Sequence, residues 1–487
     1  MLFVGTSLAV GCGVAFSQSF AESPPANTTF APYSAAQNLP VYANDASLES
    51  RISSLEAALK QKQDKPDPKK GFTRVIDGRV YFDSYNVSKQ SGSSTGIDSL
   101  SGGNNSYNGL RDLRIGVKGE GYDIFDYKVD LCFIEQTGSA SGVPLGTTIG
   151  FNNAAVNLKD VWFGVKNVPL LEYVRIGHYR LEDGVSVLTG GTNTTFFEFD
   201  GRDFATGRRI AISSRHLWAK DTIRFFAGFF YDRDIAARNR FDKNEDQGSI
   251  TNFRLTFLPY ASRDANGKID GKKILFFGGN YSYYDLTKGT TASFNERFGG
   301  LQLNSLSNLT GIATNSYNKF GLEFVYQNKS FTLQSETYAN VYNSVALNNS
   351  VKDRTIWGTY VTAKYFLTGD YRKFSADNAA WGNVDLKHNL DLRKINDLNR
   401  SEWIGGLELA AKWAYTDTSD LYDSNIATNT RFTGHVNDIT VGLNWYWTPQ
   451  ARWLFDYIHV IPSQQRGTLG RDHSDTDIFA ASFRYNF

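Results

Sequence analysis

Apolar and polar residues alternate along most of the chain that follows Gly71, and the last nine residues show the pattern most clearly. Successive side chains of a strand point to opposite faces. One face of this final segment carries the aromatic residues Phe479, Phe483, Tyr485 and Phe487. The other face carries Ser482, Arg484 and Asn486. Since chain ends tend to fray unless they are tied down, an aromatic end predicts an anchored C-terminal strand with one face toward lipid and one toward water.

The same alternation predicts sixteen strands along the rest of the chain. They span residues 72–86, 109–119, 123–135, 153–165, 170–179, 207–217, 221–231, 250–260, 272–286, 317–327, 330–342, 354–367, 403–417, 434–447, 450–462 and 475–487. Five connections are tight, at residues 119–122, 166–170, 218–221, 327–330 and 448–451, and the connections between them are long. Short turns that alternate with long loops are typical of an outer-membrane barrel, which has its turns in the periplasm and its loops outside.

Composition favours the barrel over several soluble domains. Aromatic residues make up 14% of the 487 residues, with 44 Gly and 1 Met, and the mean hydropathy is −0.37. Beyond the N-terminus, no stretch approaches the roughly 20 apolar residues that a spanning helix needs, so a membrane crossing must use strands. The net charge of +1 gives no basic field, so we expect no nucleic-acid partner. The predicted fold class is all-β, a 16-stranded antiparallel transmembrane β-barrel with a short N-terminal coiled-coil helix.

The N-terminal part of the chain divides into four segments before the barrel. Residues 2–16 are apolar and a small-x-small cleavage site follows at Ser19-Phe20-Ala21, which predicts a signal peptide at residues 1–21 without the usual basic start. Residues 22–46 are rich in Pro, Ala, Ser and Asn and predict a flexible linker. A short coiled-coil helix at 47–62 and a linker at 63–70 lead to the barrel domain at 71–487. After cleavage only Cys132 would remain, so we expect neither an internal disulfide nor a cysteine metal site.

The predicted helix carries a short heptad seam. Its apolar residues recur at spacings of four, three and four, at Leu48, Ile52, Leu55 and Leu59. Two heptads are too short to be stable alone, but a barrel that is already oligomeric would raise their local concentration. The alternatives are a helix that lies on the barrel and a tether to the cell wall.

Two segments depart from the regular pattern. Residues 368–402 join two strands where a short turn is expected, and they are strongly polar. This segment is either an unusual periplasmic insert or a sign that the strands are miscounted there. Residues 242–246 resemble the start of a calcium loop, but the glycine comes late, at Gly248, and no closing glutamate follows, so we interpret them as a solvated loop.

Alternation also assigns several cations to the lumen. Where Leu113, Ile115 and Val117 face lipid, Arg114 and Lys118 face inward. The same argument places Lys128, Arg175, Arg209 and Arg215 on the inner wall. Clustered Arg and Lys in a narrow pore attract anions and replace part of their hydration with charge-assisted hydrogen bonds. The alternative is that these cations only pair with neighbouring acids, since 51 basic residues stand against 50 acidic ones.

Several segments, taken in order, resemble the phosphate-selective porin O and P family. The most specific are Leu113–Gly119 (LRIGVKG), Tyr127–Asp130 (YKVD), Val174–Arg180 (VRIGHYR), Gly207–Ala211 (GRRIA), Tyr365–Asp370 (YFLTGD) and Val441–Tyr446 (VGLNWY). The resemblance covers roughly residues 71–487. It implies a homotrimer of 16-stranded outer-membrane porins specific for phosphate and polyphosphate.

The resemblance also implies a constriction loop, Arg180–Thr206, that folds back into the lumen. Four of its acids are candidate constriction residues: Glu182, Asp183, Glu198 and Asp200. We expect them to face Arg114, Arg175 and Arg209 across the pore and to create a transverse field. The loop and its borders add three more candidate pore cations: Arg180, Arg202 and Arg208. Such a field is equally compatible with a general diffusion pore.

The remaining chemistry is sparse. Five tryptophans lie near strand ends and predict an interfacial girdle: Trp357, Trp413, Trp445, Trp447 and Trp453. The six histidines are scattered and fit no hydrolase or zinc motif, so we do not expect an enzyme, a metal or a cofactor.

The sequence thus predicts an outer-membrane porin, embedded in lipid, that passes small hydrophilic solutes by passive diffusion, with a preference for anions and phosphate as a candidate solute. The alternative is a structural surface or adhesin-type outer-membrane barrel with a closed lumen. Ion conductance distinguishes the two.

Overall fold

The computed structural model describes residues 71–89, 106–135, 157–231, 248–286, 291–297, 305–347, 350–394, 403–422, 433–465, 471–472 and 475–487. The predicted signal peptide, both linkers and the coiled-coil helix lie outside these residues. So does the calcium-like segment at 242–246. The fold described below is therefore that of the predicted barrel domain.

Sixteen strands form the wall of the barrel. They are β1 (Val75–Lys89), β2 (Ser106–Gly121), β3 (Phe125–Glu135), β4 (Asn157–Val168), β5 (Glu172–Arg180), β6 (Arg208–Trp218), β7 (Ile223–Tyr231), β8 (Ser249–Arg263), β9 (Ile269–Asp285), β12 (Ser316–Asn328), β13 (Phe331–Leu347), β14 (Ser350–Phe366), β17 (Gly406–Asp417), β18 (Thr433–Tyr446), β19 (Ala451–Gln465) and β21 (Thr476–Asn486). Each predicted strand is present, with ends displaced by a few residues. A two-residue strand, β20 (Arg471–Asp472), pairs with the end of β19.

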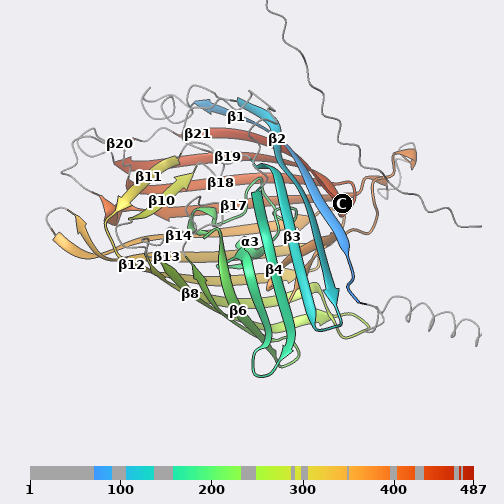
Figure 1. Ribbon diagram of the computed structural model, residues 1–487. Coiled ribbons are helices and arrows are strands. Elements are labelled where there is room, and N and C mark those ends of the chain that lie inside the picture. The colour runs from blue at the N-terminus through green and yellow to red at the C-terminus, as the bar shows by residue number, and fades with distance from the viewer. Residues whose placement is uncertain are drawn as a thin grey trace, which may run out of the picture. The chain divides into compact units, whose positions relative to one another are not determined.

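The sheet closes on itself because β1 pairs antiparallel with both β2 and β21. Each strand of the wall runs antiparallel to its neighbours, and Figure 1 shows the strands side by side around the barrel. At the closure, the backbone N–H of Phe487 donates to the carbonyl of Gly78 at 3.1 Å, and the N–H of Gly78 donates to the carbonyl of Phe487 at 3.0 Å. The predicted anchoring of the C-terminus is confirmed, and closure leaves no unpaired sheet edge in the membrane.

The outer face of the barrel is apolar. Ile115, Phe163 and Ile212 expose 42%, 42% and 51% of their surface although they sit in the middle of strands. On the C-terminal strand, Phe479 and Tyr485 are likewise exposed, while Ser482 and Arg484 on the opposite face are buried. An apolar outer face with a polar inner face is the inverse of a soluble barrel and matches a lipid environment. The predicted all-β transmembrane barrel is therefore confirmed.

The turns at one end of the barrel are tight because several residues adopt left-handed conformations. Tyr122 and Asp123, between β2 and β3, have φ of 52° and 56°. Two consecutive residues with positive φ are typical of the two-residue hairpin turns that match strand twist. This end, which also carries the C-terminus, is the periplasmic one by the usual rule for such barrels.

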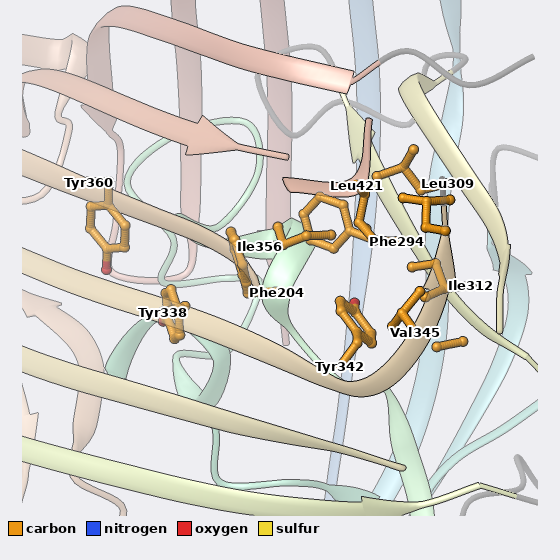
Figure 2. Close-up of a cluster of buried hydrophobic side chains, with 12 residues drawn as sticks. Phe204, Phe294, Leu309, Ile312, Tyr338, Tyr342, Val345, Ile356, Tyr360 and Leu421 are labelled. Atoms are coloured by element: carbon orange, nitrogen blue, oxygen red, sulfur yellow. The ribbon is translucent and has the colours of Figure 1, made fainter. Parts of the chain in front are cut away.

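At the opposite, extracellular end, a hairpin that is not part of the barrel wall lies over the lumen. Strands β10 (Ala292–Arg297) and β11 (Ser305–Ile312) form a separate two-stranded sheet. Phe294 of β10 packs on Phe204 of the constriction loop with ring centroids 5.1 Å apart, and Phe204 stacks on Tyr338 of β13 at 5.6 Å. Figure 2 shows the apolar cluster that these side chains build together with Leu309 and Ile312. The sequence did not predict this hairpin.

The polar segment 368–402 is an insert at the periplasmic end, so the strand count was right. It contains a hairpin of β15 (Tyr371–Ser375) and β16 (Ala380–Asp385). This hairpin turns into the barrel, where Phe374 and Trp381 pack in a buried cluster with Phe276 of β9 and Val185 of the constriction loop. Residues 395–402 of this segment lie outside the described residues.

The tryptophans form groups toward the two ends of the barrel. Near the periplasmic turn between β18 and β19, Trp447 and Trp453 contact Phe483, and Trp445 contacts Trp447. Trp357 and Trp413 flank Tyr415 toward the extracellular end. Within the described ranges, no helix is long and apolar enough to span a membrane.

Candidate functional site in the barrel lumen

The constriction loop lies inside the barrel, as the resemblance implied. It contains a single helical turn, α3 (Val185–Leu188), and a 3-10 turn, η1 (Arg202–Phe204). Leu181, Val185 and Val187 are at most 1% exposed, which is possible for a loop of this length only if the wall surrounds it. The loop is therefore part of the lumen filling.

The acids of the loop are bound by cations of the wall. Glu182 accepts two hydrogen bonds from Arg224 of β7, at 2.6 and 2.5 Å. Asp183 pairs with Lys319 of β12 at 2.9 Å. Glu198 pairs with Arg111 of β2 and with Arg202 of the loop itself. Asp200 lies 3.7 Å from Lys412 of β17.

These partners correct the predicted field across the pore. The carboxylates of the loop make their direct ion pairs with other cations than Arg114, Arg175 and Arg209. The physical reason is that the loop runs through the lumen and reaches several parts of the wall. Its acids pair with cations of β7, β12 and β17 and with Arg111 of β2.

Ionisation of two loop acids is favoured by this arrangement. Burial by itself would raise the pKa of the Glu182 carboxyl, but Arg224 and Arg254 hold it below its ordinary value. Burial opposes ionisation of Glu198 in the same way, and Arg111 with Arg202 lowers its pKa. Both carboxylates therefore act as charged anchors of the loop.

The loop backbone is fixed by further polar side chains of the wall. Glu336 of β13, 1% exposed, accepts a hydrogen bond from the backbone N–H of Val185 at 2.6 Å. Asp456 of β19 does the same for Phe197 at 2.6 Å. Arg484 of β21 donates to the carbonyl of Gly191 at 2.8 Å. These contacts hold the loop along its whole length and fix the position of the constriction.

The periplasmic hairpin adds a second constriction. Arg372 of β15 is fully buried and donates to both carboxylate oxygens of Glu408 of β17, at 2.9 and 2.6 Å. It also donates to the carbonyl of Asn193 in the constriction loop. Trp381 of β16 donates through its indole N–H to Gln334 of β13 at 2.8 Å. The hairpin and the loop therefore support one another and together occupy the part of the lumen that faces β7 to β19.

Exposure shows where the lumen stays open. On the filled side, Lys319, Glu336 and Lys364 are 1%, 1% and 3% exposed. On the side of β1 to β6, the side chains of Arg79, Lys128 and Arg208 keep 18%, 25% and 15% of their exposure. We call this side the hydrated wall.

Cations outnumber carboxylates on the hydrated wall. Among the described residues of β1 to β6, the inward-facing cations are Arg79, Arg111, Arg114, Lys128, Arg175, Arg180, Arg208, Arg209 and Arg215. The inward-facing carboxylates there are Asp83, Asp112, Asp126, Asp130 and Asp160, and Glu198 of the loop adds a further partner for Arg111. Nearer the periplasmic end, Lys118 pairs with Asp77 and Lys166 pairs with Glu120, which adds no net charge. The hydrated wall is therefore positive.

The partners of the predicted cations differ along this wall. Arg208 makes a bidentate pair with Asp160, at 2.9 and 3.0 Å. Lys128 pairs with Asp130 at 2.7 Å, and Arg114 with Asp112 at 2.8 Å. Arg180 donates to the carbonyl of Val187 at 2.6 Å.

The remaining predicted cations contact carbonyl groups or acids of the loop. Arg209 donates to the carbonyl of Arg208 at 2.9 Å, and Arg215 donates to that of Asp377 at 3.1 Å. Arg202 pairs with Glu198 inside the loop at 2.5 Å, and Glu198 also pairs with Arg111 of β2. The structure thus brings together most of the predicted cations, places Arg202 in the loop, and places Lys118 at the periplasmic end.

Sequence reasoning missed other charged residues of the lumen. They include Arg79, Arg224, Arg254, Lys319, Glu336, Arg372, Glu408, Arg452 and Arg484. Most of them follow the same signal as the residues that were found. Arg254, for example, stands between Phe253 and Leu255, which are both exposed on the outer face. In the part of the chain that the structure describes, no group of His, Cys, Asp and Glu side chains is arranged to hold a metal ion.

Comparison with known proteins gives one family and several barrels. The sequence matches the family phosphate-selective porin O and P over residues 91–487. No curated protein matches the chain.

Among solved structures, OmpT, an outer-membrane protein of Vibrio cholerae in its trimer form, is 11% identical, with 86% of this chain and 100% of that chain covered and a TM-score of 0.46. An anion-selective porin from Comamonas acidovorans is 10% identical, with 85% and 100% covered and a TM-score of 0.46. Salmonella typhi OmpF, in complex with daunomycin, is 12% identical, with 86% and 98% covered and a TM-score of 0.47.

Proposed function

The chain belongs to the phosphate-selective porin O and P family and is an outer-membrane porin, and we propose that it conducts small hydrophilic anions in preference to cations, along the hydrated wall. Passive diffusion needs no bound cofactor and no chemical step, and the family and the fold are those of a channel rather than of an enzyme.

One observation carries the anion preference, namely the excess of cations on the hydrated wall. Glu182, Asp183 and Asp200 of the constriction loop pair with cations of β7, β12 and β17 rather than with cations of the hydrated wall. A positive surface beside a narrow, low-dielectric passage concentrates anions and repels cations. Guanidinium groups also offer two parallel donors to an oxyanion.

Phosphate is the oxyanion that we propose as the preferred solute. The candidate contacts are Arg180 at the entrance to the hydrated wall, Arg208 and Arg209 beside it, and Arg175 below. Charge-assisted hydrogen bonds from several guanidinium groups would compensate for lost hydration, while weak binding at each position would still let the anion leave.

The test is a recording of single channels in planar bilayers. Under a KCl gradient, the reversal potential should have the sign of an anion-selective pore. Phosphate at submillimolar concentration should then reduce the chloride current. A current that is weakly selective and ignores phosphate would leave a general diffusion porin. A properly folded protein without any current would instead favour the structural or adhesin-type barrel with a closed lumen.

The oligomeric state and the N-terminal segments belong to the same proposal. We propose a homotrimer in which the coiled-coil helix at 47–62, tethered through residues 63–70, pairs with its copies. The support is the seam at Leu48, Ile52, Leu55 and Leu59. Chemical cross-linking of the full mature chain in detergent should give trimers, and the variant Ile52→Asp with Leu55→Asp should weaken them. Trimers that survive this double change unaltered would mean that the barrels associate without the coil.

A further inference from the structure

Two guanidinium groups of the hydrated wall are held by aromatic rings. The Cζ atom of Arg175 lies 4.2 Å from the ring centroid of Trp162 and 5.4 Å from that of Tyr173. The Cζ atom of Arg215 lies 4.5 Å from the same Tyr173 ring. Among the residues that the structure describes, neither arginine forms an ion pair with a carboxylate. Stacking on a ring orients a guanidinium but leaves its charge and its edge N–H groups available.

The hydroxyl of Tyr173 stands between Arg175 and the carboxylate on the same rung of the sheet. Asp126, Gly164 and Arg175 are direct neighbours across β3, β4 and β5. The Tyr173 hydroxyl donates to Asp126 at 2.9 Å and accepts from Nε of Arg175 at 3.1 Å. With only 5% of its surface exposed, Tyr173 has little freedom to leave this position.

Gly164 leaves the space for this contact. A Cβ atom at residue 164 would lie 2.0 Å from a carboxylate oxygen of Asp126 and 2.2 Å from the hydroxyl of Tyr173. Gly177 plays the same part for Trp162, since a Cβ there would lie 2.6 Å from the Trp162 Cα atom. Two glycines therefore make room for the two rings that support Arg175.

We propose that Tyr173 and Trp162 are positioning residues for anion selectivity. The Tyr173 hydroxyl donates a hydrogen bond to Asp126 and so keeps this carboxylate from neutralising Arg175. The inference rests on the proposed anion preference and names residues on which it depends. Aromatic support is suited to this task because a carboxylate would hold the arginines equally well but would cancel the charge that attracts the solute. Glu182, which also acts on both arginines at longer range, is bound by Arg224 and Arg254.

The variant Tyr173→Phe tests the proposal by removing one oxygen atom and keeping the ring. Asp126 should then pair with Arg175, and the chloride-to-potassium permeability ratio should fall about twofold because one wall charge is neutralised. The double variant Asp126→Asn with Tyr173→Phe should restore the ratio, since no carboxylate remains to pair. Tyr281→Phe is the matched control, because Tyr281 donates to Asn318 on the outer face of the barrel at 2.8 Å.

Several outcomes would overturn the proposal. An unchanged ratio in Tyr173→Phe would do so, and so would a double variant no more selective than the single one. If Tyr173→Phe does not fold, Trp162→Leu gives an independent test, because it removes the other ring and should also lower the ratio. A wild-type protein without anion preference would refute the proposed function itself, whereas a selective wild type that loses selectivity in Arg175→Ala but not in Tyr173→Phe would refute only the positioning role.

Discussion

The inner wall of the barrel has two sides that share one sequence pattern and differ in what faces them. On β12 and β13, inward-facing Lys319, Glu323 and Glu336 are almost fully buried against the constriction loop. On β3 and β6, inward-facing Lys128 and Arg208 remain in contact with water. Alternation therefore tells which side chains enter the lumen, but the lumen filling decides whether they anchor a loop or meet a solute.

The filling also decides the sign of the open side. The constriction loop pairs Glu182 with Arg224 of β7 and Asp183 with Lys319 of β12, and each of these pairs neutralises one positive charge on the filled side. Arg180 at the end of β5 meets the loop at the carbonyl of Val187 rather than at a carboxylate. A nearly neutral chain can thus present a positive path.

The largest predicted effect comes from removing the periplasmic hairpin, because water would then reach the filled side of the inner wall as it reaches the hydrated wall. Replacing residues 371–385 by a short turn should raise single-channel conductance several-fold and lower anion selectivity, because water and cations would reach Glu323, Glu336 and Glu408. Planar-bilayer recording measures both. Arg393→Ala is the control, since Arg393 lies in the same insert with its side chain 90% exposed. Unchanged conductance would mean that the hairpin does not limit the path.

A second predicted effect concerns the pair that holds this hairpin. Arg372→Met should leave Glu408 buried without its partner and cost about 3–5 kcal/mol of stability, with flickering current as the hairpin loosens. Thermal unfolding in detergent measures the loss. The double variant Arg372→Met with Glu408→Gln should recover much of it, because no buried charge is then left alone. If the stability losses of Arg372→Met and Glu408→Gln simply add in the double variant, the two residues contribute to stability independently.

Much of the fold could be predicted because apolar and polar residues alternate along a strand that has one face toward lipid and the other toward water. The sixteen wall strands, the closure at Phe487 and the inward cations of β2 to β6 all follow from this short-range signal. The hairpin at β15 and β16 was harder, because polar residues such as Lys373 and Asp385 mask the alternation of Phe374 and Trp381. Two bulky aromatics in a polar insert were the available signal.

The partners of the constriction loop could not be predicted. Asp183 pairs with Lys319, and Val185 donates to Glu336, across more than a hundred residues of chain. Such contacts depend on how far the loop reaches into the lumen, which the loop sequence does not reveal. The prediction placed the loop in the lumen, facing Arg114, Arg175 and Arg209, but its acids form their ion pairs with cations of β2, β7, β12 and β17.

A third predicted effect compares one cation from each side. Arg180→Gln should lower the chloride-to-potassium permeability ratio about twofold, because the charge faces the path; the amide can still donate to Val187. Lys319→Gln should leave that ratio nearly unchanged but reduce stability, because it leaves Asp183 buried without its partner. The reversal potential and the unfolding temperature separate the two cases. Equal shifts of the reversal potential would contradict the division of the wall.

The smallest predicted effect is the response of the loop to acid. The pKa values of Glu182 and Glu198 lie below the ordinary pKa of a glutamate. Both carboxylates therefore stabilise the folded loop at every pH above that ordinary pKa. This stabilisation is lost only as the pH falls through the lowered pKa values. With these two anchors charged, conductance should stay constant from pH 7 to about pH 5. It should rise at lower pH, as Glu182 and Glu198 protonate and the loop loosens. Glu182→Gln should show the loosened, higher conductance already at pH 7, because it weakens the anchor at Arg224 without acid. If conductance instead rises between pH 7 and 5 in the wild type, anchors other than these two glutamates control the loop.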